Sequence, residues 1–421
     1  MSEQDHLEFW TRTLNLADFQ VVHVRRDSLS DPLTLTVVPT MPLGLCSGCQ
    51  RATDCVHRTL DSRPVKDLSV GPQAVELIVR TYQFHCPRCD CYFTRRYSAL
   101  AEGAHATERF LEQATKLIRF SDIANAAGFL GVPEKNLERW YYDYVERKNQ
   151  ESAANFKPIK SLGIDELSLK KRRRQFVAVI VDHTNERVLD VLEGRDKDLI
   201  VKYLRENKNG LFAQLEEVTT DMWDGYVNAA KEVFGQPFRV TIDRFHVVKN
   251  FQEQLTHARR EIQRELDQEQ AKELKGTRWL WVTNPENLTP EQRKELEALK
   301  ERFPRLKQLV EQRESLRAIF EDRSIQDAAS GVNRLRDWMA QAKTIGLKAL
   351  DTFCKTLSNW LELIANYFVS RSSNGRTEGF NHGLRAILWR AYGMLNFRHF
   401  RLRVLDRFGQ PTDRFGRPAT A

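Results

Sequence analysis

The chain has 421 residues, of which 29% are charged and 41% hydrophobic, with only 20 glycines and 14 prolines. At ~100 to 200 residues per domain this length predicts about two to four domains, and the composition excludes a small disulfide-stapled scaffold, a fibrous repeat and bulk disorder. No apolar run approaches the ~20 residues that cross a bilayer, and the acidic N-terminus is unlike a secretory signal. We therefore expect a cytoplasmic protein with no membrane span.

The net charge of +8 is unevenly distributed along the chain. Residues 371–421 contain ten arginines, no lysine and three acids. Arginine favours bidentate contacts to phosphate or carboxylate, so this stretch predicts a polyanionic partner, most commonly nucleic acid. The alternative is a solvated surface in which the arginines pair with acids of the same chain.

Composition and periodicity divide the chain into five stretches. Residues 1–105 hold most of the cysteines and short β-like runs, residues 106–150 are helical, and residues 160–245 alternate strand and helix patterns. Residues 246–370 are charged and helical, and residues 371–421 form the Arg-rich C-terminal stretch. We expect an α+β multidomain protein.

Two Cys-x-x-Cys pairs lie in the first stretch. The four cysteines of these pairs are Cys46, Cys49, Cys86 and Cys89. Two such turns bring four thiolates to a tetrahedral Zn²⁺, and a site with four protein ligands is structural. Buried free cysteines are the alternative interpretation, and the additional Cys55 and Cys91 leave the ligand set open. With no export signal, the cysteines indicate a metal site in a reducing compartment.

The second stretch predicts three helices. The first runs to residue 120 with Thr107 as its N-cap, Ser121 caps a second over residues 123–127, and Gly128–Gly131 forms a turn before the third. This pattern favours a helix-turn-helix whose third helix reads the major groove of DNA. A plain helical hairpin packed on the zinc module is the alternative. The candidate DNA-contacting residues of the third helix are Lys135, Asn136, Arg139 and Tyr142.

Strand and helix patterns follow one another in a fixed order through residues 160–245. Three strands with short connectors are expected first, as an antiparallel meander, followed by a helix, a strand, a helix and a strand. The five strands are predicted over residues 161–169, 175–182, 187–192, 217–220 and 238–242. This order is typical of a ribonuclease H-like catalytic domain.

Three carboxylates fit the catalytic positions of such a domain. Asp165 lies within the first strand and Asp221 directly after the fourth, and these positions are neighbours in the sheet. Glu378, in the first turn of a later helix, supplies the third carboxylate. Carboxylate oxygens hold Mg²⁺, with Mn²⁺ as the alternative ion. Two ions ~4 Å apart activate the attacking oxygen and stabilise the leaving oxygen in phosphoryl transfer.

Each acid also has a structural interpretation. Asp221 fits a helix N-cap and Glu378 fits the positive end of a helix dipole, whereas an acid in an apolar strand such as Asp165 is harder to explain structurally. Other acids compete for the same roles, because spacing does not exclude them. These rivals are Asp182, Asp224 and Asp243.

The 156 residues between Asp221 and Glu378 are too many for a simple connection, so we expect an all-helical insertion in the catalytic domain. The simplest interpretation of the insertion is a structural scaffold; the more specific hypothesis is that it binds flanking DNA or a second protomer. Trp279 and Trp281 are candidates for stacking on bases, with core packing as the alternative.

The later motifs of the chain resemble those of one known family. They are Gly163-Ile164-Asp165-Glu166, Val191-Leu192-Glu193-Gly194-Arg195, Thr220-Asp221-Met222-Trp223 with Tyr226, Asp243-Arg244-Phe245-His246-Val247, Asn287-Leu288-Thr289, Asn374-Gly375-Arg376-Thr377-Glu378-Gly379-Phe380-Asn381 and Ala391-Tyr392-Gly393. With them the chain resembles bacterial insertion-sequence transposases of the ISL-three family, over roughly residues 40–408. The paired cysteines and the helix-turn-helix-like segment occur in that family's order.

The resemblance implies a DDE transposase that excises and reinserts its own element by Mg²⁺-dependent phosphoryl transfer. It implies Asp165, Asp221 and Glu378 as the catalytic triad, in agreement with the positions chosen from the predicted fold. The implied partners are the element's terminal inverted repeats and target DNA, bound by a homodimer or larger assembly in the bacterial cytoplasm.

Basic side chains outside the third helix are expected to follow the DNA backbone. They are Lys170, Lys171, Arg172, Arg173, Arg174, Arg376, Arg385 and Arg390. Two other functions stay open from the residues alone. One is a ribonuclease H-like nuclease without strand transfer, and the other is a zinc-dependent DNA-binding regulator whose acids are structural.

Overall fold

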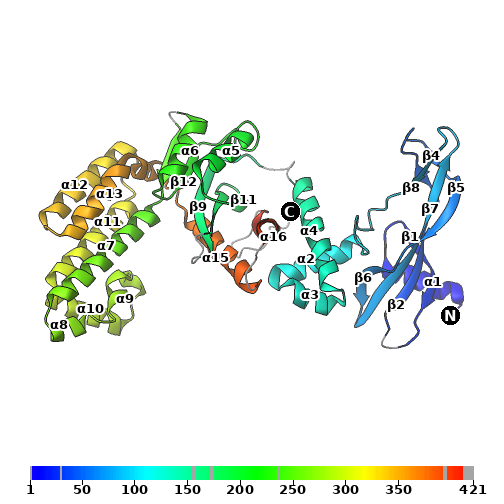
Figure 1. Ribbon diagram of the computed structural model, residues 1–421, viewed down its shortest axis with the longest axis horizontal. Coiled ribbons are helices and arrows are strands. Elements are labelled where there is room, and N and C mark those ends of the chain that lie inside the picture. Colours follow the sequence, from blue (N-terminus) through cyan, green and yellow to red (C-terminus); the bar gives the residue numbers. More distant parts are fainter. Residues whose placement is uncertain are drawn as a thin grey trace. The chain divides into compact units, whose positions relative to one another are not determined.

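A computed structural model describes residues 2–28, 31–152, 157–170, 175–235, 238–391 and 396–410 of the chain. They form a mixed α/β protein with two compact units, Met1–Ala154 and Asn155–Ala421 (Figure 1). The first unit combines a β-rich module with three helices, and the second combines a five-stranded sheet with a large helical region. No helix in the described part of the chain is long and apolar enough to cross a membrane.

The first unit opens with a β-rich module. Its elements are α1 (Glu3–Leu14), β1 (Phe19–Arg25), β2 (Leu33–Pro39), β3 (Gly44–Leu45), β4 (Ala52–Thr53), β5 (Val56–Asp61), β6 (Val65–Val70), β7 (Gln73–Cys86) and β8 (Cys91–Thr94). The main sheet runs β1-β2-β7-β5, and β6 and β8 also pair with β7. Because side chains alternate along β2, Leu33, Leu35 and Val37 share one face and pack with Val75 and Leu77 of β7.

Three helices complete the first unit: α2 (Glu108–Phe120), α3 (Ile123–Leu130) and α4 (Glu134–Ser152). A buried aspartate of β6, Asp67, fastens them to the sheet. Its carboxylate accepts hydrogen bonds from the hydroxyl of Thr107 at 2.7 Å and from Nε of Arg109 at 2.8 Å. Thr107 is also the N-cap of α2, as predicted. The helices and the β-rich module therefore share one buried polar contact.

Two local predictions in this segment are wrong. Asp122, and not Ser121, caps α3, because its carboxylate accepts a hydrogen bond from the third backbone N–H of the helix. The predicted Gly128–Gly131 turn is shorter, since α3 continues through Gly128. Only Gly131, with φ of 61°, takes the left-handed conformation that ends a helix.

The second unit is built on a five-stranded sheet. Its strands are β9 (Ser161–Lys170), β10 (Gln175–Asp182), β11 (Arg187–Leu192), β12 (Glu217–Thr220) and β13 (Arg239–Ile242), close to the predicted positions. The spatial order is β11-β10-β9-β12-β13. β10 is antiparallel to both β9 and β11, whereas β12 is parallel to both β9 and β13.

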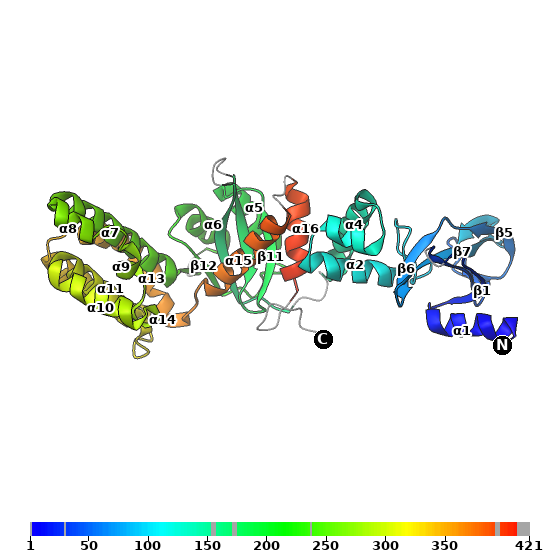
Figure 2. The ribbon, with the colours of Figure 1, turned by 90° about the horizontal axis from the view of Figure 1, so that it is seen from below.

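Helices cover both faces of this sheet (Figure 2). One layer consists of α5 (Lys197–Asn207) and α6 (Asp224–Phe234), and the other of α15 (Gly375–Arg390) and α16 (Phe397–Phe408). Ala178 and Ile180 of β10 pack in the core of the first layer, while Val177 and Val179 pack against the second. Both faces of β10 are apolar, so it is the continuous apolar run expected of a strand buried on two sides.

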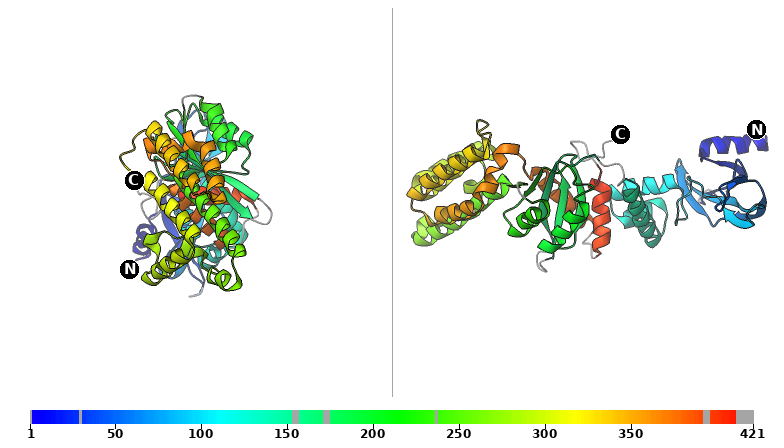
Figure 3. Two further views of the ribbon diagram at one scale, coloured as in Figure 1. Left: turned by 90° about the vertical axis from the view of Figure 1, so that its left-hand side faces the viewer. Right: turned by 90° about the horizontal axis from the view of Figure 1, so that it is seen from above.

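Along the chain, a helical region separates β13 from α15, and in Figure 3 its helices run from green through yellow to orange. Its elements are α7 (Arg244–Glu265), α8 (Gln268–Glu273), α9 (Arg278–Val282), the 3-10 helix η3 (Pro285–Asn287), α10 (Pro290–Arg302), α11 (Pro304–Glu321), α12 (Ala328–Thr344), α13 (Lys348–Ala365) and α14 (Tyr367–Ser370). Thr289 begins α10 with a capping box. Trp281 is fully buried and donates its indole N–H to Thr277, which favours core packing over base stacking, whereas Trp279 is 66% exposed.

One rival acid of the sequence analysis, Asp182, has a structural role at the end of β10. Its carboxylate accepts hydrogen bonds from Nε of Arg187 at 3.0 Å and from the backbone N–H of Asn185 at 2.9 Å. The side chains of Asp182 and Arg187 are both buried. This ion pair therefore holds the β10–β11 turn together inside the sheet.

We expect Asp182→Asn to lower the free energy of unfolding by about 3 kcal/mol, because it removes the buried carboxylate that pairs with the Arg187 guanidinium. The control is Glu216→Gln, which removes only an exposed ion pair with Lys160 and should cost less than about 1 kcal/mol. Urea unfolding followed by tryptophan fluorescence measures both. Equal midpoints for the two variants would contradict the assignment.

Candidate functional site

Three aspartates come to the same edge of the five-stranded sheet. Thr220, the last residue of β12, pairs with Ile164 of β9, and Ile242, the last residue of β13, pairs with Thr220. The next residue on each of these three strands is an acid: Asp165, Asp221 and Asp243. The parallel pairing thus places three carboxylates side by side at the edge where β12 and β13 end, while β9 continues to Lys170. Open α/β sheets bind ligands at the carboxyl ends of their parallel strands.

Helix α15 approaches the strand that carries Asp165. A side chain at Gly163 of β9 would collide with His183 and with Thr377 of α15, so glycine allows this close approach. Nε2 of His183 and Oγ1 of Thr377 form a hydrogen bond of 2.7 Å. Burial, with the nearby charge of Arg376, lowers the pKa of His183 to about 4, so its ring is neutral. This contact fixes the first turn of α15, which contains Glu378.

Asn381 joins the same helix to the carboxylate of Asp165. Its amide nitrogen donates to Oδ2 of Asp165 at 2.8 Å, while the backbone N–H of Glu166 donates to Oδ1, also at 2.8 Å. Asn381 is buried, and its amide oxygen has no hydrogen-bond partner among the described residues. Since Asn381 lies three residues after Glu378, the two side chains share one face of α15.

The aspartates share an environment that disfavours their charged forms. Burial raises the pKa of Asp165 to about 6, with a smaller upward contribution from Glu378. Burial also raises the pKa of Asp221 to about 7, helped by the negative charge of Asp165. Lys249 of α7 opposes both shifts. A cation bound among these groups would therefore relieve an existing repulsion.

The two remaining rival acids, Asp224 and Asp243, differ in burial. Asp224 is exposed in the first turn of α6. Asp243 is buried, and its carboxylate accepts a hydrogen bond from the backbone N–H of Phe245 at 3.3 Å, so it caps α7. Burial raises the pKa of Asp243, and the charge of Asp165 raises it further. Asp243 is thus a helix cap that also belongs to the acid cluster.

Sequence reasoning missed three residues of this cluster: Asn381, His246 and Lys249. His246 and Lys249 follow Asp243 on one face of α7 and interact electrostatically with Asp165 or Glu378. The spacing of Asp243, His246 and Lys249 by three residues was a usable signal, because such residues lie together on a helix.

The four cysteines of the two Cys-x-x-Cys pairs converge in the first unit. They are the only described group of three or more potential metal-ligating side chains whose ligand atoms all lie within 4.8 Å of one another. Sγ of Cys46 lies 3.4 Å from that of Cys89, and Sγ of Cys49 lies 3.8 Å from that of Cys86. Thiolates held at ~2.3 Å around a tetrahedral Zn²⁺ would be about 3.8 Å apart, so the four sulfurs fit a structural zinc ion.

Two hairpins bring these cysteines together. The β3–β4 turn carries Cys46 and Cys49, while Cys86 ends β7 and pairs with Cys91 at the start of β8. The backbone N–H of Cys49 lowers the pKa of the Cys46 thiol to about 6, which favours the thiolate that zinc requires. Cys91 also lies close, with its Sγ 3.2 Å from that of Cys46, whereas Cys55 is exposed.

The candidate DNA-contacting residues of α4 are mostly accessible. Lys135, Asn136 and Arg139 are exposed on its first two turns. Tyr142 is buried and therefore does not face a DNA groove.

The arginines of the C-terminal stretch divide into two groups. Arg376 donates to the carbonyl of His183 at 2.7 Å and pairs with Glu186, and Arg401 makes a bidentate ion pair with Asp190. Arg385 and Arg390 are exposed on α15. The side chain of Lys170 and the residues Lys171, Arg172, Arg173, Arg174, Tyr392 and Gly393 lie outside the described part of the chain.

Comparisons with known proteins agree on one family. A family model described as a transposase of the ISL3 type matches residues 162–404, and a model for the zinc finger of the IS204, IS1001, IS1096 and IS1165 transposases matches residues 42–89. The chain is 24% identical over 379 residues to the transposase for insertion sequence element IS1001 of Bordetella parapertussis, covering 89% of this chain and 91% of that protein. It is 26% identical over 211 residues to the transposase for IS1557 of Mycobacterium tuberculosis, covering 45% of this chain and 47% of that protein.

We expect Cys49→Ser and Cys89→Ser to lose most of the bound zinc, whereas Cys91→Ser and the exposed Cys55→Ser should keep about one ion per chain. The zinc-finger match ends at Cys89, which favours this residue over Cys91 as the fourth ligand. Elemental analysis of the purified chains measures the zinc, and the visible spectrum of the Co²⁺-substituted protein reports the thiolates. Zinc retained in Cys89→Ser but lost in Cys91→Ser would reverse the assignment.

The raised pKa values of Asp165 and Asp221 predict a pH dependence of stability. Because the folded state binds these protons more tightly than the unfolded state, stability is highest at low pH and falls as the pH rises from about 4 to about 7. We expect Asp221→Asn to raise the Tm at pH 8, without added Mg²⁺, by a few degrees and to leave it unchanged at pH 4. Differential scanning calorimetry measures this, with the exposed Asp224→Asn as the control. An equal rise in the Tm of Asp221→Asn at both pH values would contradict the raised pKa of Asp221.

Proposed function

Because the chain belongs to the ISL3 family of transposases, we propose that it cuts and joins DNA at the ends of its own insertion sequence, with Asp165, Asp221 and Glu378 as the catalytic carboxylates. The family implies DNA cleavage and strand transfer. The assignment of these three residues, of two Mg²⁺ ions and of the strand-transfer step is our own.

The register of the sheet is the observation that carries this proposal. It sets the residues before Asp165 and Asp221 side by side on parallel strands, and Glu378 stands on the helix that Asn381 fastens to Asp165. The sheet order, three antiparallel strands followed by two parallel ones, supports a ribonuclease H-like arrangement interrupted by the helical region. Hard carboxylate oxygens on adjacent strands fit a divalent cation.

The chain's own residues would prepare the site in three ways. Asn381 and the N–H of Glu166 orient the carboxylate of Asp165, while the close contact at Gly163 fixes the helix of Glu378. Lys249 contributes a positive charge beside the acids, suitable for a DNA phosphate. Bound Mg²⁺ would supply Lewis-acid activation of water and of the scissile phosphate. Its binding would also lower the raised pKa values of the acids.

The first unit would recognise the DNA. The zinc cluster stabilises the β-rich module, and Asp67 fastens α2 to that module, so α4 stands on a rigid base. We assign the exposed Lys135, Asn136 and Arg139 to the element's terminal inverted repeats, as a helix-turn-helix would use them. Arg385 and Arg390 are the exposed candidates for phosphate contacts in the second unit. Two element ends require at least two chains, so we expect a dimer or larger assembly on DNA.

The decisive experiment is cleavage and strand transfer on a labelled duplex that carries the DNA flanking this gene, with Mg²⁺ present. Asp165→Asn, Asp221→Asn and Glu378→Gln should each reduce cleavage at least about a hundredfold while DNA binding changes less than about twofold. Asp224→Asn is the matched control, because this acid lies three residues after Asp221 but is exposed on α6.

Other outcomes would favour the two alternative functions. A wild-type chain that binds this DNA but never cuts it would indicate a DNA-binding regulator. Cleavage without strand transfer would indicate a nuclease. Cleavage that survives all three substitutions would overturn the triad.

A further inference from the structure

A groove opens beside the acid cluster, where the helical region meets the sheet. The start of α7, the end of α11 and the segment that precedes α15 line it, and its volume is about 280 Å³. This is just below the ~300–1,000 Å³ range of pockets that hold drug-sized molecules, so it suits a single base with its sugar. The residues that matter for its chemistry are Arg244, Phe245, Lys249, Asn284, Arg317 and Phe320.

Aromatic rings give the groove an apolar floor and one accessible face. Phe320 is buried and stacks on Phe368, with ring planes 9° apart and centroids 5.8 Å apart. Phe245 is 44% exposed although it lies beside the buried Asp243. An exposed ring on a rigid helix is a surface on which a planar base can stack.

Two basic side chains of the groove make no direct ion pair in the described part of the chain, although Lys249 interacts at longer range with Asp165 and Asp221. Neither Arg244 nor Lys249 forms an ion pair with any residue in the described ranges, and the Arg244 guanidinium lies 5.4 Å from the ring centroid of Tyr367. The amide of Asn284 makes no hydrogen bond within the described chain. Free cations bind phosphate, and a free amide can bind the edge of a base.

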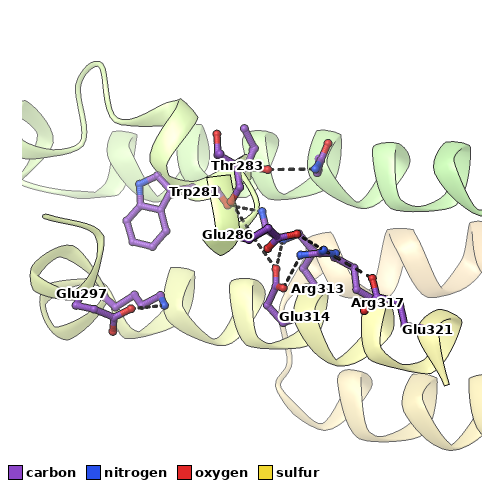
Figure 4. Close-up of polar contacts among 11 residues, drawn as sticks. Trp281, Thr283, Glu286, Glu297, Arg313, Glu314, Arg317 and Glu321 are labelled. Atoms are coloured by element: carbon purple, nitrogen blue, oxygen red, sulfur yellow. Dashed lines mark hydrogen bonds and ion pairs between the residues drawn. The ribbon is translucent and has the colours of Figure 1, made fainter. Parts of the chain in front are cut away.

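On the opposite wall of the groove, the basic side chain Arg317 is already engaged by carboxylates, one of which, Glu321, also lines the groove. Figure 4 shows Arg317 held by Glu286, Glu314 and Glu321, at 2.7, 2.8 and 3.8 Å. The neighbouring Arg313 is buried and donates to the carbonyl of Trp281 at 2.7 Å. Since Arg317 is occupied by three acids, Arg244 and Lys249 are the groove's cations for an anionic ligand.

The groove is continuous with the acid cluster. Asp243 and Lys249 line it, and both interact electrostatically with Asp165. Gly375, which begins the helix of Glu378, lines it as well. A ligand in the groove would therefore lie next to the carboxylates that we assign to catalysis.

We propose that this groove binds one unpaired nucleotide of the DNA strand that is cut, with its base against Phe245 and its phosphates at Arg244 and Lys249. The inference rests on the proposed function for the identity of the strand. A groove of this size suits one nucleotide, which must leave the duplex to enter it at a cost of a few kcal/mol that stacking and phosphate contacts would offset. Holding it there would fix the neighbouring phosphate in front of Asp165 and Asp221.

Photocrosslinking of the full chain tests this binding without requiring cleavage. The probe is a short single-stranded oligothymidylate with one 5-iododeoxyuridine, and mass spectrometry maps the crosslinked peptide. We expect adducts on Phe245–Lys249, the tryptic peptide after Arg244; in Lys249→Gln the corresponding tryptic peptide extends to Arg259 and is the one counted. Phe245→Leu and Lys249→Gln should each lower the total adduct yield on the peptide that starts at position 245 at least about fivefold, the lower end of what loss of base stacking costs. Phe245→Trp should restore it.

Lys355→Gln is the matched control, because Lys355 is exposed on α13 and does not line the groove. A competition experiment adds free thymidine monophosphate to the oligothymidylate. If the groove binds a nucleotide within a strand, the free nucleotide should displace the oligonucleotide poorly. Full competition would show a site for free nucleotides and would overturn the proposal. Adducts only on other peptides, or a yield unchanged in Phe245→Leu, would also overturn it. If Phe245→Leu fails to fold, the wild-type adduct map alone decides.

Failure of this inference and failure of the proposed function give different results. Asp165→Asn should keep the Phe245 adduct while losing cleavage. A wild-type chain that cuts DNA normally, without an adduct on this peptide, would remove the groove inference and leave the transposase proposal intact. An adduct on a chain that never cuts DNA would keep the nucleotide-binding groove and remove the transposase proposal.

Discussion

The close approach of α15 to β9 is the contact on which the second unit depends. It needs a glycine at position 163, where any side chain would collide with His183 and Thr377, and it buries the Asn381–Asp165 hydrogen bond between the helix and the strand. The sheet edge by itself presents only aspartates. Docking α15 there adds Glu378 from a segment more than two hundred residues away along the chain, since Asp165 and Asn381 are 216 residues apart.

Burying acids together is unfavourable, and the surrounding structure shows how the cost is contained. Asn381 and the backbone N–H of Glu166 donate hydrogen bonds to the carboxylate of Asp165, and Asp243 caps α7. Lys249 adds a positive charge near these acids. The remaining cost, mainly of burial and to a smaller extent of repulsion between the acids, appears as the raised pKa values of Asp165 and Asp221. Such a cluster is more stable with protons or cations than without them, which is the property that the proposed metal-dependent chemistry uses.

The helical region has its own buried core and adds a second surface to the same site. The buried Arg313 of α11 donates a hydrogen bond to the carbonyl of Trp281 in α9, and Arg317 is engaged by carboxylates on one wall of the groove beside the acids. The free cations and the exposed ring of Phe245 stand on α7, which begins at the end of β13. One helix therefore links the acid cluster to the groove.

Local patterns in the sequence are enough to predict the strands of the sheet, the Thr107 cap and the two cysteine pairs, because each depends on residues close together in the chain. The ISL3 motifs likewise indicate the family from the amino-acid sequence alone. Only the tertiary structure separates Asp182, which pairs with Arg187, from Asp243, which joins the acid cluster, and the engaged Arg376 and Arg401 from the exposed Arg385 and Arg390. It also supplies Asn381 and the groove at Phe245. The contacts of Arg376, Arg401 and Asn381 join residues about two hundred positions apart, and the roles of Asp182 and Asp243 depend on burial. No local pattern encodes which distant groups will meet or which acids will be buried.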